Sequence, residues 1–256
     1  MLQSATPFQV SLARSEAEIR AAQRLRYDVF VTEFGSDGDG VDHENRLETD
    51  AFDAHADHLL LRDTRLTSGA TDQIVGVYRL MTQTQADRAG EFYSASEFDL
   101  TPLETSGLRL LELGRSCLHP DYRGGAALMA LWRGVAEYVS DRGIELLFGT
   151  ASFRGTDAAA LQHPISDLHR RFLAPPDLRV TSRMKRDIAL LPADRIDRKR
   201  AMRDTPALIK SYLKLGGFIG QGVYVDHAFN SVDVCVILKA SDLDPSLLQF
   251  PDRRAA

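Results

Sequence analysis

Two charged residues stand inside an apolar run that is typical of a buried strand. The run extends over residues 108–118, with Glu112 at its centre and Arg115 three residues later. A glutamate is rarely buried without a partner, and a carboxylate on a core strand can accept a proton from a reacting group, directly or through water. A structural ion pair between Glu112 and Arg115 is the alternative interpretation, and the sequence leaves both open.

The spacing of these two residues bears on whether they act together. In a regular strand, residues three positions apart point to opposite faces of the sheet. Gly114 lies between them, and a glycine inside a strand can mark a β-bulge. Such a bulge would turn Arg115 to the same face of the sheet as Glu112. We therefore predict an irregular strand at Gly114.

The chain has two cysteines, Cys117 and Cys235, and both lie in apolar, strand-like runs. Two cysteines are too few for a disulfide framework, and buried free cysteines usually behave as small hydrophobic residues. A reactive thiolate would need a neighbouring base, for which only His119 is close in sequence. Because Pro120 follows His119 directly, we predict two buried thiols.

A short segment also combines potential metal ligands, namely Asp53, His55, Asp57 and His58. Their spacing matches no established zinc pattern, and His58 begins an apolar run that reads as a strand. We therefore predict no bound metal.

Apolar periodicity and turn residues predict the elements that must position these side chains. The expected strands are 8–12, 58–62, 74–80, 108–118, 145–150 and 232–238, and the expected helices are 15–33, 124–142, 157–172 and 206–215. Ser15 and Glu18 have the spacing of a capping box, and Gly143 is a typical helix end. Pro164 should break or kink the third helix, and Thr205 should cap the fourth.

The order of these elements predicts an α/β fold. The strand–helix–strand unit over residues 108–150 implies two parallel strands with a right-handed crossover. A chain of 256 residues fits one large domain, which we expect to comprise a core over about 8–155 and an extension over about 156–240. No secretory signal and no membrane-spanning run are visible. A cytoplasmic protein is expected, with peripheral membrane binding left open.

Charge is unevenly distributed along a chain whose formal net charge is −5. Residues 33–57 contain nine acidic residues and one arginine, whereas residues 170–203 contain eleven basic and four acidic residues. The net excess of seven positive charges favours an acidic partner, either an acidic carrier protein or an anionic membrane surface. Nucleic acid is not expected, because no recognised module is present and Phe172 is the only aromatic residue there. A merely solvated face is the alternative.

Short motifs occur along the chain in an order that resembles the acyl-homoserine-lactone synthases and their relatives, the ornithine-lipid Nα-acyltransferases. The shared motifs are Arg26-Tyr-Asp-Val-Phe30, Glu48-Thr-Asp50-Ala-Phe-Asp53, Gly76-Val-Tyr-Arg79-Leu80 and Glu112-Leu-Gly-Arg115-Ser-Cys-Leu118. A C-terminal block is similar to the second family and absent from the first. That block comprises residues 207–217, Gly222-Val-Tyr-Val-Asp226 and Phe229-Asn-Ser-Val-Asp233. The resemblance covers roughly residues 10–240.

The resemblance implies a GNAT-like acyltransferase fold, with a mixed central sheet flanked by helices and a C-terminal extension. It also implies transfer of a 3-hydroxyacyl group from acyl carrier protein, without a further cofactor, to the α-amino group of an amino acid. With ornithine as acceptor, the product would be a lyso-ornithine lipid. Glutamine or another amino acid as acceptor, an autoinducer-lactone synthase, and a non-catalytic binding protein are the alternatives.

The resemblance also assigns residues to the site. Glu112 and Arg115 are the expected catalytic pair. Asp50 and Asp53 could hold the cationic groups of the acceptor, while arginines could bind its carboxylate or lock those aspartates in place. The full expected acceptor set is Arg26, Phe30, Asp50, Asp53, Arg79, Asp226 and Asp233. The residues expected at the phosphopantetheine of the donor are Leu118, Arg123, Gly124 and Gly125.

The loop before the central helix departs from the pattern of enzymes that use coenzyme A. Those enzymes place small residues there, so that backbone amides at the helix N-terminus bind the pyrophosphate. Here Ala126 and Leu128 replace part of that pattern, although Gly124 and Gly125 still permit close backbone approach. A carrier protein supplies one phosphodiester and no nucleotide pyrophosphate. The loop therefore predicts a carrier-protein donor.

Overall fold

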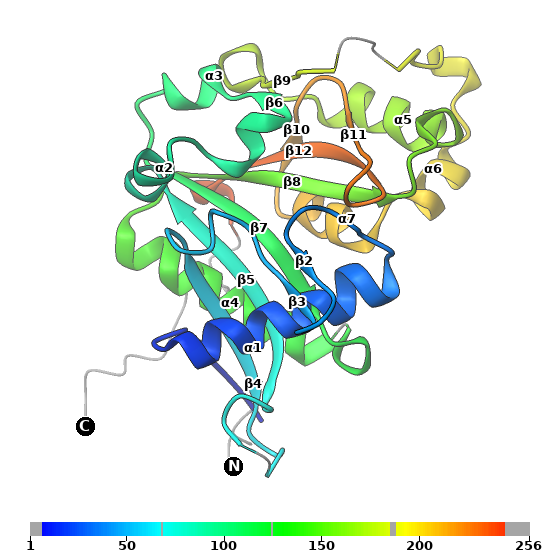
Figure 1. Cartoon of the computed structure of the whole chain (residues 1–256). Coiled ribbons are helices and arrows are strands. Elements are labelled where there is room, and N and C mark those ends of the chain that lie inside the picture. The colour runs from blue at the N-terminus through cyan, green and yellow to red at the C-terminus, as the bar shows by residue number, and fades with distance from the viewer. Residues whose placement is uncertain (1–6, 68, 124, 185–187, 244–256) are drawn as a thin grey trace, which may run out of the picture. The chain divides into compact units, whose positions relative to one another are not determined.

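The computed structural model describes residues 7–67, 69–123, 125–184 and 188–243, and the chain is an α/β protein (Figure 1). Its contacts divide it into two compact units. The first holds the described parts of Met1–Met81 and Leu113–Gly143, and the second holds those of Thr82–Glu112 and Ile144–Leu243. We expected the core to end near residue 155, but the two units do not divide there. That the chain forms a single domain stays a prediction.

The first unit is built on antiparallel strands and one strand that it shares with the second unit. The strand order is β1-β4-β5-β7, with β1 (Phe8–Leu12), β4 (Asp57–Asp63), β5 (Ile74–Thr82) and β7 (Leu110–Leu118). Phe8 pairs with Asp63, and the hairpin of β4 and β5 has a register shift between Leu61 and Arg62. The strands expected over residues 8–12, 58–62, 74–80 and 108–118 are confirmed.

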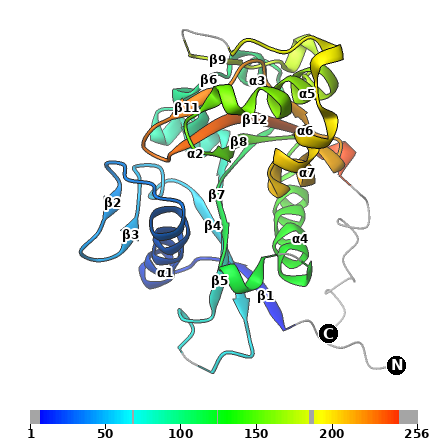
Figure 2. The same ribbon diagram turned by 90° about the vertical axis from the view of Figure 1, so that its right-hand side faces the viewer.

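Helices α1 (Glu16–Arg26) and α4 (Gly125–Arg142) cover opposite faces of this sheet (Figure 2). The apolar side of α1 packs Ala22 and Leu25 against Leu60 and other buried residues of the sheet. On the other face, α4 approaches so closely that a Cβ on Gly134 would lie 2.4 Å from Val10 Cγ1. Burial of both faces explains why the strands read as nearly continuous apolar runs.

The first helix differs from its expected form. The α-helix ends at Arg26, and the chain continues as a π-helix over Tyr27–Glu33. Ser15 does accept a hydrogen bond from the backbone of Glu18, at 3.3 Å. The Glu18 carboxylate, however, accepts from the Arg14 backbone at 2.7 Å and also from Arg62. The capping box expected at Ser15 is therefore wrong in its second half, because Arg62 of β4 helps to fix the position of the glutamate.

The second unit continues from β7 in the order β7-β8-β12-β10, and β11 pairs with β12. These strands are β8 (Leu146–Arg154), β10 (Phe218–Ile219), β11 (Tyr224–Asp226) and β12 (Ser231–Lys239). Strands β7 and β8 are parallel, with Glu112 opposite Phe148, which confirms the expected parallel strands. Strand β12 runs antiparallel to β8 and places Asp233 opposite Ser152.

Helices and short ribbons complete both units. The second unit contains α2 (Gln83–Ala89), α3 (Thr101–Glu104), α5 (Gln162–Phe172), α6 (Arg198–Asp204) and α7 (Ala207–Lys214), with α5 packed on α6 and α7 packed on β8 and β12. The short ribbons pair β2 (Val41–Asp42) with β3 (Leu47–Glu48) and β6 (Phe98–Asp99) with β9 (Thr181–Ser182). None of the described helices is long and apolar enough to cross a lipid bilayer.

Two expectations about the helices of the second unit are wrong at least in part. The helix expected over residues 157–172 is divided into a 3₁₀ turn over Ala158–Leu161 and α5, which begins at Gln162. Pro164 therefore lies in the first turn of α5, where no intrahelical amide bond is lost. Thr205 does not cap α7, whose N-cap is Pro206. The hydroxyl of Thr205 instead donates to the carbonyl of Ala201 in α6, at 2.8 Å. Helix α6 itself was not expected, because its sequence is too polar to show an apolar stripe.

Candidate active site

Six charged side chains of the first unit form a closed ring of alternating charge. Three arginines and three carboxylates take part, and none of their side chains is more than 16% exposed. Around the ring, the order is Arg26, Glu48, Arg115, Asp50, Arg79 and Asp53, which returns to Arg26. The charges balance, so the ring is neutral as a whole.

The contacts of the ring are short and specific. Arg26 binds Glu48 through Nε and binds Asp53 through Nη1 at 2.7 Å. Arg79 Nη1 lies 2.5 Å from Asp50 Oδ1 and 3.0 Å from Asp53 Oδ1. Charged groups buried in this way require partners, because removal from water carries a large desolvation cost.

Arg115 closes the ring from β7. It donates to Glu48 at 3.1 Å and to Asp50 at 2.8 Å. Its backbone has φ +49°, a left-handed conformation that is uncommon outside glycine. The irregularity expected at Gly114 therefore lies one residue later, at Arg115 itself.

The arginines hold the two aspartates in their ionised form. Burial raises the pKa of Asp53, but Arg26 and Arg79 outweigh this effect and keep the pKa below its ordinary value. Burial likewise opposes ionisation of Asp50, and Arg115 with Arg79 lowers its pKa. Of the two roles expected for the arginines, locking the aspartates matches these contacts. Contact of these residues with the acceptor stays a prediction.

Glu112 belongs to the second unit and is clamped by backbone amides. It is 3% exposed; its Oε1 accepts from the Ser94 amide at 2.7 Å and its Oε2 from the Tyr93 amide at 3.0 Å. These amides come from the 3₁₀ turn Tyr93–Ser96, which no periodicity of the sequence predicts. These two hydrogen bonds fix the position of the carboxylate.

A third group of carboxylates lies elsewhere in the second unit. One oxygen each of Glu97, Asp226 and Asp233 lies within 4.8 Å of the other two. Asp226 and Asp233 were expected at the acceptor, whereas Glu97 was not. Glu97 follows the turn that clamps Glu112, and no local pattern links it to residues on β11 and β12. We name Glu97, Asp226 and Asp233 the acidic cluster.

Three of the residues expected at the donor, Leu118, Arg123 and Gly125, are described by the structure. Arg123 directs its guanidinium to Glu33, with hydrogen bonds of 2.7 and 2.5 Å, and its Nε lies 3.4 Å from the carbonyl of Leu118. Gly125 begins α4 with φ +54°. Gly124 lies outside the described residues, and Phe30 packs beside the core of α1 and the sheet.

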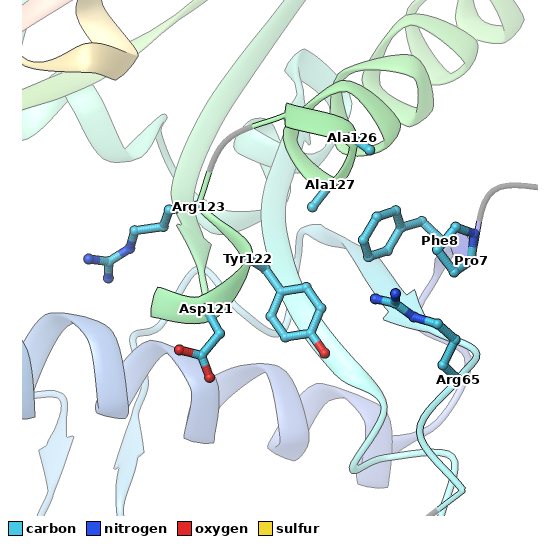
Figure 3. Close-up of a pocket in the computed structure, with 8 residues that line it drawn as sticks. All are labelled: Pro7, Phe8, Arg65, Asp121, Tyr122, Arg123, Ala126 and Ala127. Carbon is cyan, nitrogen blue, oxygen red and sulfur yellow. The ribbon is translucent and has the colours of Figure 1, made fainter.

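A pocket of about 530 Å³ lies next to this loop (Figure 3). Its lining residues are Pro7, Phe8, Arg65, Asp121, Tyr122, Arg123, Ala126 and Ala127. The guanidinium of Arg123 points away from Phe8 and Arg65 (Figure 3). Arg123 is thus engaged with Glu33, and its role at the phosphopantetheine stays a prediction.

Neither cysteine is suited to nucleophilic chemistry. Cys117 and Cys235 are both buried, and burial raises the pKa of each thiol well above its ordinary value. The prediction of two buried thiols is confirmed. His58 is also buried, which lowers its pKa, and its Nε2 lies 3.1 Å from the backbone carbonyl of Asp53.

Comparison with known proteins defines the class. The family model described as "Acetyltransferase (GNAT) domain" matches residues 25–133. The crystal structure of the AHL synthase LasI aligns with a TM-score of 0.53 at 13% identity, covering 96% of this chain and 98% of that one. FeeM, an N-acyl amino acid synthase from uncultured soil microbes, aligns with a TM-score of 0.52 at 12% identity, covering 91% and 90%. The fold is therefore that of a GNAT-type acyltransferase, as expected.

Similarity to a protein of known name identifies the family within this class. The L-ornithine N(alpha)-acyltransferase of Rhodobacter capsulatus is 49% identical over 247 residues, covering 96% of this chain and 95% of the relative. The chain belongs to the L-ornithine Nα-acyltransferase family and is an N-acyltransferase. The resemblance inferred from the ordered motifs and the C-terminal block is confirmed.

Proposed function

We propose that this enzyme transfers a 3-hydroxyacyl group from acyl carrier protein to the α-amino group of ornithine, and that it thereby forms a lyso-ornithine lipid. The observation that carries the proposal is the clamped Glu112 carboxylate on β7, in a chain whose relative at 49% identity is named for ornithine acylation.

The proposed reaction requires a neutral amine. An α-amino group is largely protonated near pH 7, so Glu112 accepts one of its protons, directly or through water. The amine nitrogen then attacks the thioester carbonyl, the new C–N bond forms, and the C–S bond breaks. The nitrogen then loses its second proton, the leaving pantetheine thiolate takes up one proton, and the proton held by Glu112 passes to solvent. The products are the amide and the free thiol of the carrier protein.

The donor can be tested directly with the purified enzyme and ornithine. We expect kcat/KM to be at least about tenfold higher with 3-hydroxyacyl carrier protein than with the coenzyme A ester of the same acid, a difference of about 1.4 kcal/mol. The reason is the loop before α4, where Ala126 and Leu128 depart from the pyrophosphate-binding pattern. Mass spectrometry of the product identifies the acylated amino acid. An equal or higher value with the coenzyme A ester would refute the carrier-protein donor.

The basic segment of residues 170–203 is proposed as the surface that meets the acidic carrier protein. Part of its charge is neutralised locally, since Arg171 pairs with Asp167, and both Arg200 and Arg203 pair with Asp204. Among the described residues, exposed cations at Arg195, Arg198 and Lys199 have no ion pair. These three charges can attract an acidic surface.

Replacing Arg195, Arg198 and Lys199 together by alanine tests this surface. We expect kcat/KM for the carrier-protein donor to fall about tenfold at low salt, with kcat nearly unchanged, because long-range attraction acts on association. Increasing salt should reduce the wild-type value more than that of the variant. Arg200 is retained because it also bonds Asp204 and the carbonyl of Ala160.

Two controls show whether the lower kcat/KM of the triple variant is due to weaker contact with the carrier protein. Arg88→Ala removes an exposed cation elsewhere in the second unit and should change little. A pantetheine thioester without the carrier protein should show no difference between the variant and the wild type. If the variant matches the wild type with the carrier protein but binds anionic vesicles less tightly, the segment meets a membrane instead.

A further inference from the structure

We propose that the acidic cluster of Glu97, Asp226 and Asp233 binds the side-chain ammonium of the acceptor amino acid, and that it thereby selects a cationic acceptor. This inference rests on the proposed function and adds the residues that determine acceptor specificity. It differs from the sequence-based assignment by including Glu97 and by placing the cation away from Asp50 and Asp53.

The geometry of the cluster suits an ammonium group. The three carboxylate oxygens lie within 4.8 Å of one another. A nitrogen at the centre of a triangle of that size lies about 2.8 Å from each corner, which is the usual length of a charge-assisted N–H···O bond. An ammonium group has three N–H donors, one for each carboxylate. Arg154 of β8 is paired with Ser231, and the backbone amide of Arg183 donates to the carbonyl of Glu97 at 2.8 Å.

A buried hydroxyl on the same sheet face provides independent evidence for a ligand. Ser231 is 4% exposed, and within the described part of the chain its Oγ has no hydrogen-bond partner. Ser231 pairs directly with Asp226 across β11 and β12, and it precedes Asp233 by two residues on β12. Paired residues and alternate residues share a sheet face, so the hydroxyl points toward the cluster. Buried hydroxyls usually have a partner, and a bound ammonium would supply one.

The position of the cluster also fits a single acceptor that reaches Glu112. The turn Tyr93–Ser96 provides the amides that clamp Glu112, and Glu97 is the next residue. Burial is the main reason that the pKa of Cys235 is raised, and the charges of Glu112 and Glu97 add to it, so both carboxylates lie near Cys235 on β12. Ornithine carries its two amino groups at the ends of a short carbon chain, and one could lie at Glu112 while the other lies at the cluster.

The ring in the first unit is a less suitable site for this ammonium. Each carboxylate of the ring already binds two arginines, and the ring is neutral. A second cation would have to displace an arginine from a buried ion pair, which would leave a buried charge without compensation.

The test compares two acceptors that differ only in the side-chain amine, ornithine and norvaline. For the wild type we expect kcat/KM with ornithine to exceed that with norvaline by at least about 10²-fold, since a site built for a charged group rejects the analogue that lacks it. Glu97→Gln and Asp233→Asn should each reduce this ratio by at least about tenfold, mainly through the KM for ornithine. Glu104→Gln, at an exposed glutamate of the second unit, should leave the ratio unchanged.

A binding measurement keeps the inference independent of turnover. Calorimetric titration with ornithine and norvaline should show tighter binding of ornithine to the wild type and no such preference in Asp233→Asn, with thermal unfolding as the check on folding. If the variant lost affinity equally for ornithine and norvaline, the residue would have a structural role and the inference would be overturned. Loss of transfer to either acceptor on chelation, with recovery on adding Mg²⁺ or Mn²⁺, would assign the cluster to a metal. If the wild type binds ornithine selectively but does not acylate it, the proposed function fails and this inference stands.

Discussion

Glu112→Gln should lower the turnover number by about 10²-fold or more, which is the usual effect of losing a general base. The glutamine amide has the size of the carboxylate but cannot take a proton from the acceptor. The defect should shrink as the pH rises, because an increasing fraction of the amine is then already neutral. The measurements are kcat across pH with carrier-protein donor and saturating ornithine.

The hydrogen bonds of Glu112 determine which control measurements the Glu112→Gln variant needs. Tyr93 and Ser94 both donate to the carboxylate, and the amide nitrogen of glutamine can accept from neither. A loss of stability of about 1–3 kcal/mol is therefore expected, and thermal unfolding must show that the variant is folded under assay conditions. Glu145→Gln, at a partly exposed glutamate, is the matched control. A turnover near that of the wild type at neutral pH would remove Glu112 from the mechanism.

Arg26→Met should destabilise the folded state by about 3–5 kcal/mol, the usual cost of removing one partner from a buried ion pair. Arg26 is completely buried and binds both Glu48 and Asp53. Without it, two buried carboxylates lose a partner each. For a chain of this size, the loss should lower the midpoint of thermal unfolding by on the order of 10 °C. Chemical denaturation at neutral pH gives the free energy of unfolding directly.

The pH dependence of stability provides a second readout of the ring. The pKa values of Asp50 and Asp53 are lowered in the folded state. Their contribution is therefore present above the ordinary aspartate pKa of 3.8 and is lost as the pH falls through the lowered folded values. The wild type should lose stability in acid more steeply than Arg26→Met, in which part of this contribution is already missing.

Arg46→Met is the matched control for the ring. Arg46 pairs with Asp28 at the surface, where both side chains are about half exposed, and such pairs contribute roughly 0–1 kcal/mol. If Arg26→Met unfolded with a free energy within about 1 kcal/mol of the control, the ring would contribute little to stability. The aspartates would then be available for a role at the acceptor.

The main strands, the central helices and the candidate catalytic Glu112 could all be predicted from the amino-acid sequence alone. Alternating or continuous apolar runs depend only on neighbouring residues, so β1, β4, β5, β7 and β12 could be located closely. Glu112 stood out because a charge within an apolar strand is rarely accidental. The ordered motifs and the C-terminal block were sufficient to indicate the family that a relative at 49% identity then established.

Which of these residues contact one another depends on the three-dimensional fold. Arg26, Glu48 and Arg115 join one ring only because the order of the strands and the path of the chain bring them together. Glu97 joins Asp226 and Asp233 for the same reason. Local patterns encode the period of an element and its buried side, but not its neighbours in the sheet, its register or a single left-handed residue such as Arg115. These features depend on the packing energy of the whole chain, and in this protein they determine which charged side chains meet in the ring and which meet in the acidic cluster.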